Sequence, residues 1–116
     1  MAAPNIVNVS SILGKTAVMA VTTTPTAIVT NSVANHVLKV DQILVTNING
    51  TTNATVNIDL FRSSTAYRIA YVMTVPAGAT LDILSRLMYL EEGDSLRLTA
   101  SANSYLEAIA SYEDIS

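Results

Sequence analysis

The sequence has no cysteine and no tryptophan, and its 116 residues include a single histidine. Without cysteine, the chain cannot form a disulfide scaffold, a thiolate metal site or a cysteine nucleophile. Charged residues make up 13% of the chain, against about 25% in ordinary soluble domains. The chain thus has few side chains that could serve as a nucleophile, acid or base in catalysis. The sequence therefore predicts a protein that is not an enzyme and needs no cofactor.

Long apolar runs are also missing, although the mean hydropathy is +0.41. No stretch approaches the roughly 18 to 20 apolar residues that a membrane-spanning helix needs. The first cation, Lys15, follows the mildly apolar N-terminal stretch, whereas a secretory signal begins with cations. We therefore expect the chain to be made and folded in a bacterial cytoplasm, with no membrane partner.

Positive charge is scarce and scattered. Six Lys and Arg against nine Asp and Glu give a net charge of -3 and a pI near 4.8. A protein that neutralises phosphates gathers its cations on one surface. The sequence therefore predicts no nucleic-acid partner.

What the chain has in abundance is β-branched residues. Val, Ile and Thr number 12, 10 and 14, together 36 of 116 residues, and this class packs well on pleated sheets and is stiff in helices. Residues 54–62 alternate, with Val56, Ile58 and Leu60 on one face and Asn57, Asp59 and Phe61 on the other, as a half-buried strand does. The segments with strand patterns are 16–21, 26–31, 37–48, 54–62, 67–75, 79–84, 94–101 and 105–113. The sequence predicts an all-β protein of about eight strands.

Turn residues separate these segments. Gly50 follows Asn49, Gly78 comes two residues after Pro76, and Gly93 precedes Asp94. Glycine tolerates the positive φ that hairpin turns require. We therefore expect hairpins at 50, 77 and 92. A single sheet of this size would leave one apolar face exposed to water, and a second sheet packed against it covers that face. The prediction is an antiparallel, jelly-roll-like β-sandwich over residues 15–116, with a short helix within 81–90 as a local alternative.

The first 14 residues differ from the rest, because Asn and Ser interrupt their apolar pattern. Terminal segments become ordered when they dock, and an extended segment docks readily on a sheet edge. We expect residues 1–14 to form either an arm that pairs with a neighbour or the first strand of the same subunit. The candidate partner-binding residues are the aliphatic side chains of this segment: Ile6, Val7, Val9, Ile12 and Leu13.

High hydropathy joined to little charge leaves apolar surface uncovered in a domain of this size. Obligate subunit interfaces are apolar and poor in charge, which is the composition found here. The sequence therefore predicts a homo-oligomer, with a trimer as the expected number. A monomer with a surface rich in Ala and Thr is the alternative.

Three sequence features could belong to a catalytic or ligand-binding site, and for each of them a structural role is favoured. His36 lies in a predicted loop without the Gly-X-Ser-X-Gly elbow of a serine hydrolase. Residues 14–16, Gly-Lys-Thr, resemble the end of a phosphate-binding loop, but Val9 stands where that motif needs a second glycine. The acids of residues 91–94 predict a solvated hairpin tip, with loose calcium binding as the alternative.

Aromatic and charged residues between 59 and 71 fit structural roles. Tyr67 and Tyr71 fall on one face of an alternating strand, which indicates a core or interface position ahead of a sugar-stacking platform. Arg62 lies near Asp59, and Arg68 lies across a hairpin from it. We expect exposed ion pairs with carboxylates, worth about 0–1 kcal/mol each.

Short motifs follow one another along nearly the whole chain. They are Ala-Pro-Asn-Ile-Val-Asn-Val at 3–9, Ile-Leu-Gly-Lys-Thr at 12–16, Ile-Leu-Val-Thr-Asn at 43–47, Val-Pro-Ala-Gly-Ala-Thr-Leu at 75–81, Tyr-Leu-Glu-Glu-Gly-Asp-Ser-Leu at 89–96 and Ser-Tyr-Glu-Asp-Ile at 111–115. In this order and spacing, the chain resembles the small β-sandwich virion proteins of tailed bacteriophages, particularly those of cyanobacterial and marine hosts.

The resemblance implies a structural protein of a phage virion, first of all a capsid decoration or cement protein. Such a protein binds the major capsid protein on the outside of the shell and stabilises the shell. A neck, collar or tail component is the second role that the resemblance implies, and it carries over no catalytic residue and no metal ligand. Outside this family, a small carbohydrate-binding sandwich is the alternative, although such modules usually display Trp or clustered aromatic residues.

Overall fold

The computed structural model describes residues 10–84 and 86–116. Over these ranges the chain forms nine strands and no helix, so there is no helix of the length and apolarity that crossing a bilayer demands. The strands are β1 (Ile12–Val21), β2 (Thr26–Thr30), β3 (Val37–Asn47), β4 (Ala54–Arg62), β5 (Thr65–Val75), β6 (Thr80–Asp82), β7 (Met88–Leu90), β8 (Ser95–Ala100) and β9 (Leu106–Ile115). The predicted all-β fold is confirmed.

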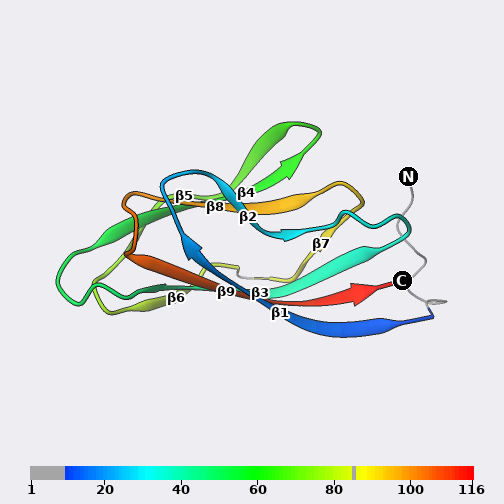
Figure 1. Ribbon diagram of the computed structural model, residues 1–116, viewed down its shortest axis with the longest axis horizontal. Coiled ribbons are helices and arrows are strands. Elements are labelled where there is room, and N and C mark those ends of the chain that lie inside the picture. Colours follow the sequence, from blue (N-terminus) through cyan, green and yellow to red (C-terminus); the bar gives the residue numbers. More distant parts are fainter. Residues whose placement is uncertain (1–9, 85) are drawn as a thin grey trace.

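Two antiparallel sheets pack as a sandwich, and Figure 1 shows them as two layers. Sheet A has the order β1-β9-β3-β6, with β7 also paired to β3, and sheet B has the order β2-β8-β4-β5. Because β6 and β7 bond to opposite ends of β3, they share one strand position. Eight strand positions in these two orders form a jelly roll. The predicted jelly-roll-like sandwich is therefore confirmed.

The core lies between the layers and follows from the alternation of each strand. Ile58 of β4 faces Leu98 of β8 across their ladder, and both side chains are fully buried. In sheet A, Ile43 and Val45 of β3 are buried beside Ala110 of β9. Each such aliphatic stabilises the fold by about 1.5–3 kcal/mol.

The hairpins expected at 50, 77 and 92 are wrong. The loops at these positions connect β3 to β4, β5 to β6 and β7 to β8, and each crosses from one sheet to the other. The local turn chemistry is nevertheless right at two of them, because Gly78 and Gly93 have φ of 71° and 90°. Turn residues indicate where the backbone bends sharply, but they do not indicate which sheet the next strand joins.

The consecutive strands that do pair side by side are β4 and β5. Their turn consists of Ser63 and Ser64, which have φ of 51° and 61°. Positive φ at both turn positions matches the twist of the flanking strands. Neither residue is glycine or asparagine, so the sequence carries no strong signal for this turn.

The segment 81–90 is not helical in its described part. It contains the end of β6 and the whole of β7, a strand that the alternation pattern does not predict. The first strand also differs from the prediction, because β1 begins at Ile12 and not at residue 16. Residues 12–14 of the expected arm therefore belong to a strand of this subunit, and residues 1–9 lie outside the described part of the chain.

Two buried asparagines flank the ends of β3. The Nδ2 of Asn31 donates to the carbonyl oxygens of His36 and Leu90, both at 2.9 Å. The Nδ2 of Asn47 donates in the same way to Thr52 at 2.9 Å and Val75 at 3.0 Å. Buried carbonyl groups need such donors. These two side chains therefore satisfy loop backbone that would otherwise lack partners at both ends of the sandwich.

Candidate interaction surface

The most distinctive surface of the molecule is the outer face and free edge of sheet A at β1. Among the described strands β1 pairs with β9 alone, in an unbroken register from Ile12 opposite Ile115 to Val21 opposite Leu106. Alternation points Met19 toward the core and its neighbour Val18 to the outside. The Val18 side chain is 73% exposed, an unusual position for an apolar β-branched residue in the middle of a long strand.

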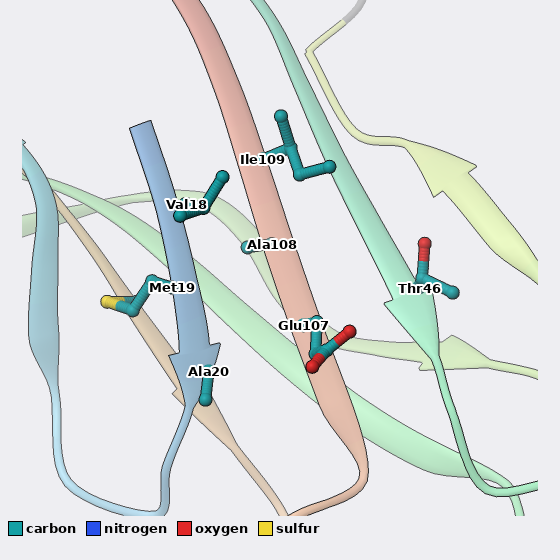
Figure 2. A pocket seen from close by; sticks show the side chains of 7 residues that line it. All are labelled: Val18, Met19, Ala20, Thr46, Glu107, Ala108 and Ile109. Atoms are coloured by element: carbon teal, nitrogen blue, oxygen red, sulfur yellow. The ribbon is translucent and has the colours of Figure 1, made fainter. Parts of the chain in front are cut away.

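A shallow hollow of about 410 Å³ lies on this face. Val18 stands directly opposite Ile109 of β9, which is 43% exposed. Figure 2 shows these two side chains over β1 and β9, with the Glu107 carboxylate further along β9 and Thr46 on β3. The surface therefore consists of aliphatic groups with one carboxylate beside them. This composition suits contact with another protein surface better than binding of a small polar ligand.

The predicted partner-binding residues fall into two groups. Ile12 and Leu13 begin β1 and are 55% and 52% exposed, so they share a strand with Val18. The other three, Ile6, Val7 and Val9, lie outside the described residues.

Val18 and Ile109 are not among the residues that the sequence singles out. Both sit in predicted strands, and the strand pattern does contain a signal for Ile109. It occupies an outward position between Glu107 and Ser111, where strict alternation calls for a polar side chain. An apolar residue on the polar face of a strand is the pattern that identifies this surface.

A second cluster joins β4 to the loop before β8. Asp94 is 2% exposed, and the Nε of Arg62 donates to its Oδ1 at 2.8 Å while a terminal nitrogen of Arg62 donates to Glu91 at 2.8 Å. The hydrogen bond from Arg62 lowers the pKa of Asp94 below its ordinary value, and burial opposes this shift. Arg62 thus pairs with carboxylates, as expected, and its partners are Asp94 and Glu91.

The acids of residues 91–94 are also less exposed than the predicted hairpin tip. Glu92 accepts the backbone N–H of Asn35 at 3.2 Å, and Asp94 is held by Arg62 and by the N–H of Glu91 at 2.9 Å. Within the described ranges, no group of three or more His, Asp or Glu side chains is arranged to hold a metal ion. Protein donors bind both oxygens of Asp94 and one oxygen of Glu92, while the other Glu92 oxygen, Oε1, is buried without a hydrogen-bond partner.

The outer face of sheet B carries the expected pair of Arg68 and Asp59. A terminal nitrogen of Arg68 donates to the nearly buried Asp59 at 2.9 Å and 3.1 Å. The same guanidinium lies 4.9 Å from the centre of the Tyr71 ring. Next to it, Arg97 of β8 lies 4.2 Å from the ring centre of Phe61. These stacked cations and rings cover part of this face, while Val72 and Met73 of the edge strand β5 remain 53% and 36% exposed.

Tyr67 and Tyr71 do not share a face, contrary to the prediction. Tyr67 stands opposite Leu60 and Ala70 stands opposite Ile58, with a register shift between them. The extra residue in β5 reverses the alternation, so Tyr71 falls on the side opposite to Tyr67. Both rings are exposed, by 55% and 64%, which also excludes the predicted core position.

His36 has a structural partner. Its Nδ1 lies 2.6 Å from Oδ1 of Asp114 in β9, and the Nζ of Lys15 in β1 lies 3.4 Å from Oδ2 of the same carboxylate. The three side chains come from the loop before β3 and from two strands of sheet A. This contact ties the loop to the end of the sheet that bears Ile12 and Leu13.

The comparisons with known proteins address the fold. No family model matches the sequence, and no curated protein matches it. The fold is similar to that of a chain from a solved structure described as "Bacillus endospore appendages form a novel family of disulfide-linked pili". The TM-score is 0.54 at 12% identity, over 91% of this chain and 88% of that chain. At this identity the similarity establishes a shared β-sandwich fold, in agreement with the fold that the resemblance to virion proteins implies.

Proposed function

We propose that the protein is a structural subunit that works in many copies within a larger particle. The observation that carries this proposal is the surface at β1, where a long free strand edge adjoins the exposed Val18 and Ile109. Proteins that act as monomers usually protect their sheet edges and scatter their exposed apolar side chains. A neighbouring subunit would cover both the backbone groups of this edge and the aliphatic side chains. The proposal assigns no catalytic residue.

The finer proposal is a place on a phage virion, supported by the ordered motifs that run along the chain. The protein would then be a decoration or cement protein, made in the host cytoplasm, that forms a homotrimer and binds the major capsid protein on the outer shell. Binding to the assembled shell but not to its free subunits stabilises the shell by mass action. A neck, collar or tail position is the other location within the virion.

A mass-spectrometric inventory of separated heads and tails, prepared from phage particles that encode this sequence, tests the virion proposal. We expect the protein in the head fraction, at a constant ratio to the major capsid protein. Recovery from the tail fraction alone would assign it to the neck or tail instead. Absence from both fractions would overturn the virion proposal and leave the multi-copy proposal to be tested separately.

A surface appendage is the second candidate, and the structural similarity to a subunit of endospore pili favours it. The pili in that description are disulfide-linked, and this sequence contains no cysteine, so that linkage cannot hold the present subunits together. Electron microscopy of the purified protein separates the two candidates. Long filaments of this protein alone favour an appendage, and closed oligomers favour decoration of a shell.

The carbohydrate-binding alternative finds little support in the geometry. A sugar-stacking platform needs aromatic rings on one face, and the register shift in β5 places Tyr67 and Tyr71 on opposite faces. We expect no saturable binding on a glycan array. Saturable binding that is lost in Tyr71→Ala would support this alternative.

A further inference from the structure

Three of the four sheet edges carry features that discourage pairing with another strand. In sheet B, the edge strand β5 has two register shifts against β4, and β2 is five residues long with a register shift of its own. The far edge of sheet A consists of β6 and β7, each three residues long. Bulges and short strands are the usual means by which proteins prevent edge-to-edge pairing.

The fourth edge, β1, has none of these features. It is ten residues long, contains no proline, and carries one charged residue, Lys15. Its register with β9 is continuous over its whole length. A long, regular and nearly uncharged edge strand is a template for an added strand.

The chain leading into β1 suggests which strand is added. The N–H groups of Ser10 and Ser11 both donate to the carbonyl oxygen of Ser116, at 2.8 Å and 3.1 Å, and the N–H of Ser116 donates back to Ser11 at 2.9 Å. The β1–β9 ladder thus continues to Ser11, and the chain bends at Ser10. Nine further residues, Met1 to Val9, precede this point.

These nine residues are poorly suited to pair with their own β1. To pair with its own β1, the segment would need a tight turn that reverses it, and Pro4-Asn5 is the place in the sequence where two turn residues stand together. Only three residues would then remain to pair. Extended, by contrast, nine residues span about 30 Å at about 3.3 Å per residue, close to the length of β1.

We propose that residues 5–9 of one copy add as an extra strand along the β1 edge of a second copy. This inference rests on the proposed multi-copy function and names the contact that builds it. The segment Asn5-Ile6-Val7-Asn8-Val9 has no charged side chain, so nothing in it repels Lys15 of the acceptor strand. Pro4 lacks a backbone N–H and limits the added ladder at that end.

The contact is head-to-tail, because the segment of one copy meets the edge of the next. A repeated head-to-tail contact closes into a ring if the rotation permits and otherwise continues as a filament. The predicted trimer is one such ring. The same contact thus serves both assemblies considered under the proposed function.

The test uses the full chain and a variant that lacks residues 2–9. All nine strands lie within residues 12–115, so we expect the truncated variant to melt within a few degrees of the full chain. A labelled synthetic peptide of residues 2–9 should bind the truncated variant, as followed by fluorescence anisotropy. A peptide with Val7→Pro, which removes one backbone donor, should bind at least about tenfold more weakly.

The acceptor edge is tested by a matched pair of substitutions in the truncated variant. Val18→Lys places a charge on the exposed middle of β1, and Thr74→Lys places one on an exposed residue of the β5 edge. Peptide affinity should fall at least about tenfold in the first variant and stay unchanged in the second. Failure of the peptide to bind, or equal losses in both variants, overturns this inference if the full chain still assembles. A full chain that does not assemble contradicts the proposed function itself.

Discussion

At the scale of single residues, the molecule depends on carboxylates that are buried and paired. Asp94 and Asp59 are both nearly inaccessible, and each is bound by an arginine that reaches in from the surface. Burying a carboxylate removes its hydrating water, which costs free energy. If the arginine partner is removed, that cost remains and nothing offsets it. The arginines therefore matter more for stability than their own exposed positions suggest.

Arg62→Met tests this directly. The substitution keeps much of the aliphatic length of the side chain and leaves Asp94 with the backbone N–H of Glu91 as its remaining donor in this cluster. We expect the free energy of unfolding to fall by about 1–3 kcal/mol, measured by urea denaturation at neutral pH. The control is Lys15→Met, which removes a longer and more exposed contact with Asp114 and should cost less than about 1 kcal/mol. Equal losses in the two variants would contradict the account.

The pH dependence of stability follows from the lowered pKa of Asp94. The ordinary value is 3.8, and the folded value lies below it because Arg62 donates to the carboxylate. Below about pH 5 the unfolded chain begins to take up a proton that the folded protein does not, so stability is complete above this range and falls as the pH drops through the folded pKa. Denaturant unfolding of the parent protein between pH 7 and acid should show this loss.

The matched variant is Asp94→Asn. It removes the titrating group, so its unfolding free energy should depend less steeply on pH between about 5 and 3 than that of the parent, although it is less stable at neutral pH. The same slope in both proteins over this range would show that other carboxylates govern the acid transition.

At the scale of elements, strands were easier to predict from the sequence than their connections. Residues 54–60 alternate between small or apolar and polar side chains, and β4 has the predicted bounds, Ala54–Arg62. The extra residues in β5 place Tyr67 and Tyr71 on opposite faces of the sheet. These insertions leave no mark in the apolar pattern of the sequence, so alternation alone could not reveal them. Whether a loop turns back or crosses to the other sheet depends on packing between distant strands, which no local pattern contains.

Gly78 and Gly50 provide a matched pair of substitutions that tests the backbone conformation of two loops. A methyl group would meet nothing within 4 Å at either Gly78 or Gly50, but Gly78 has φ of 71° and Gly50 is not among the residues with positive φ. Gly78→Ala should therefore cost about 1 kcal/mol, whereas Gly50→Ala should be neutral or stabilising by up to about 1 kcal/mol. Thermal unfolding of the two variants checks this, and a similar melting temperature for both would contradict the backbone argument.

At the scale of the whole molecule, the sequence predicted the sandwich, and two of the residues that it proposed for partner binding lie on the candidate interaction surface. Ile12 and Leu13 were identified from their place in an apolar N-terminal segment, and the structure puts them on the strand whose edge is free. Val18 and Ile109 were missed, since their exposure depends on a pairing between residues about 90 positions apart. Composition indicated that an apolar surface exists, and the fold was needed to locate it.

The most direct test of the central claim is the mass of the purified full chain in solution, measured by sedimentation equilibrium over a wide range of concentration. The account predicts an assembly of several copies, a trimer if the expected number is right. It also predicts that Val18→Lys, at the exposed centre of β1, shifts the protein to single copies while its melting temperature stays close to that of the parent. A full chain that sediments as a single copy at every concentration would contradict the claim that this protein is a subunit built to assemble.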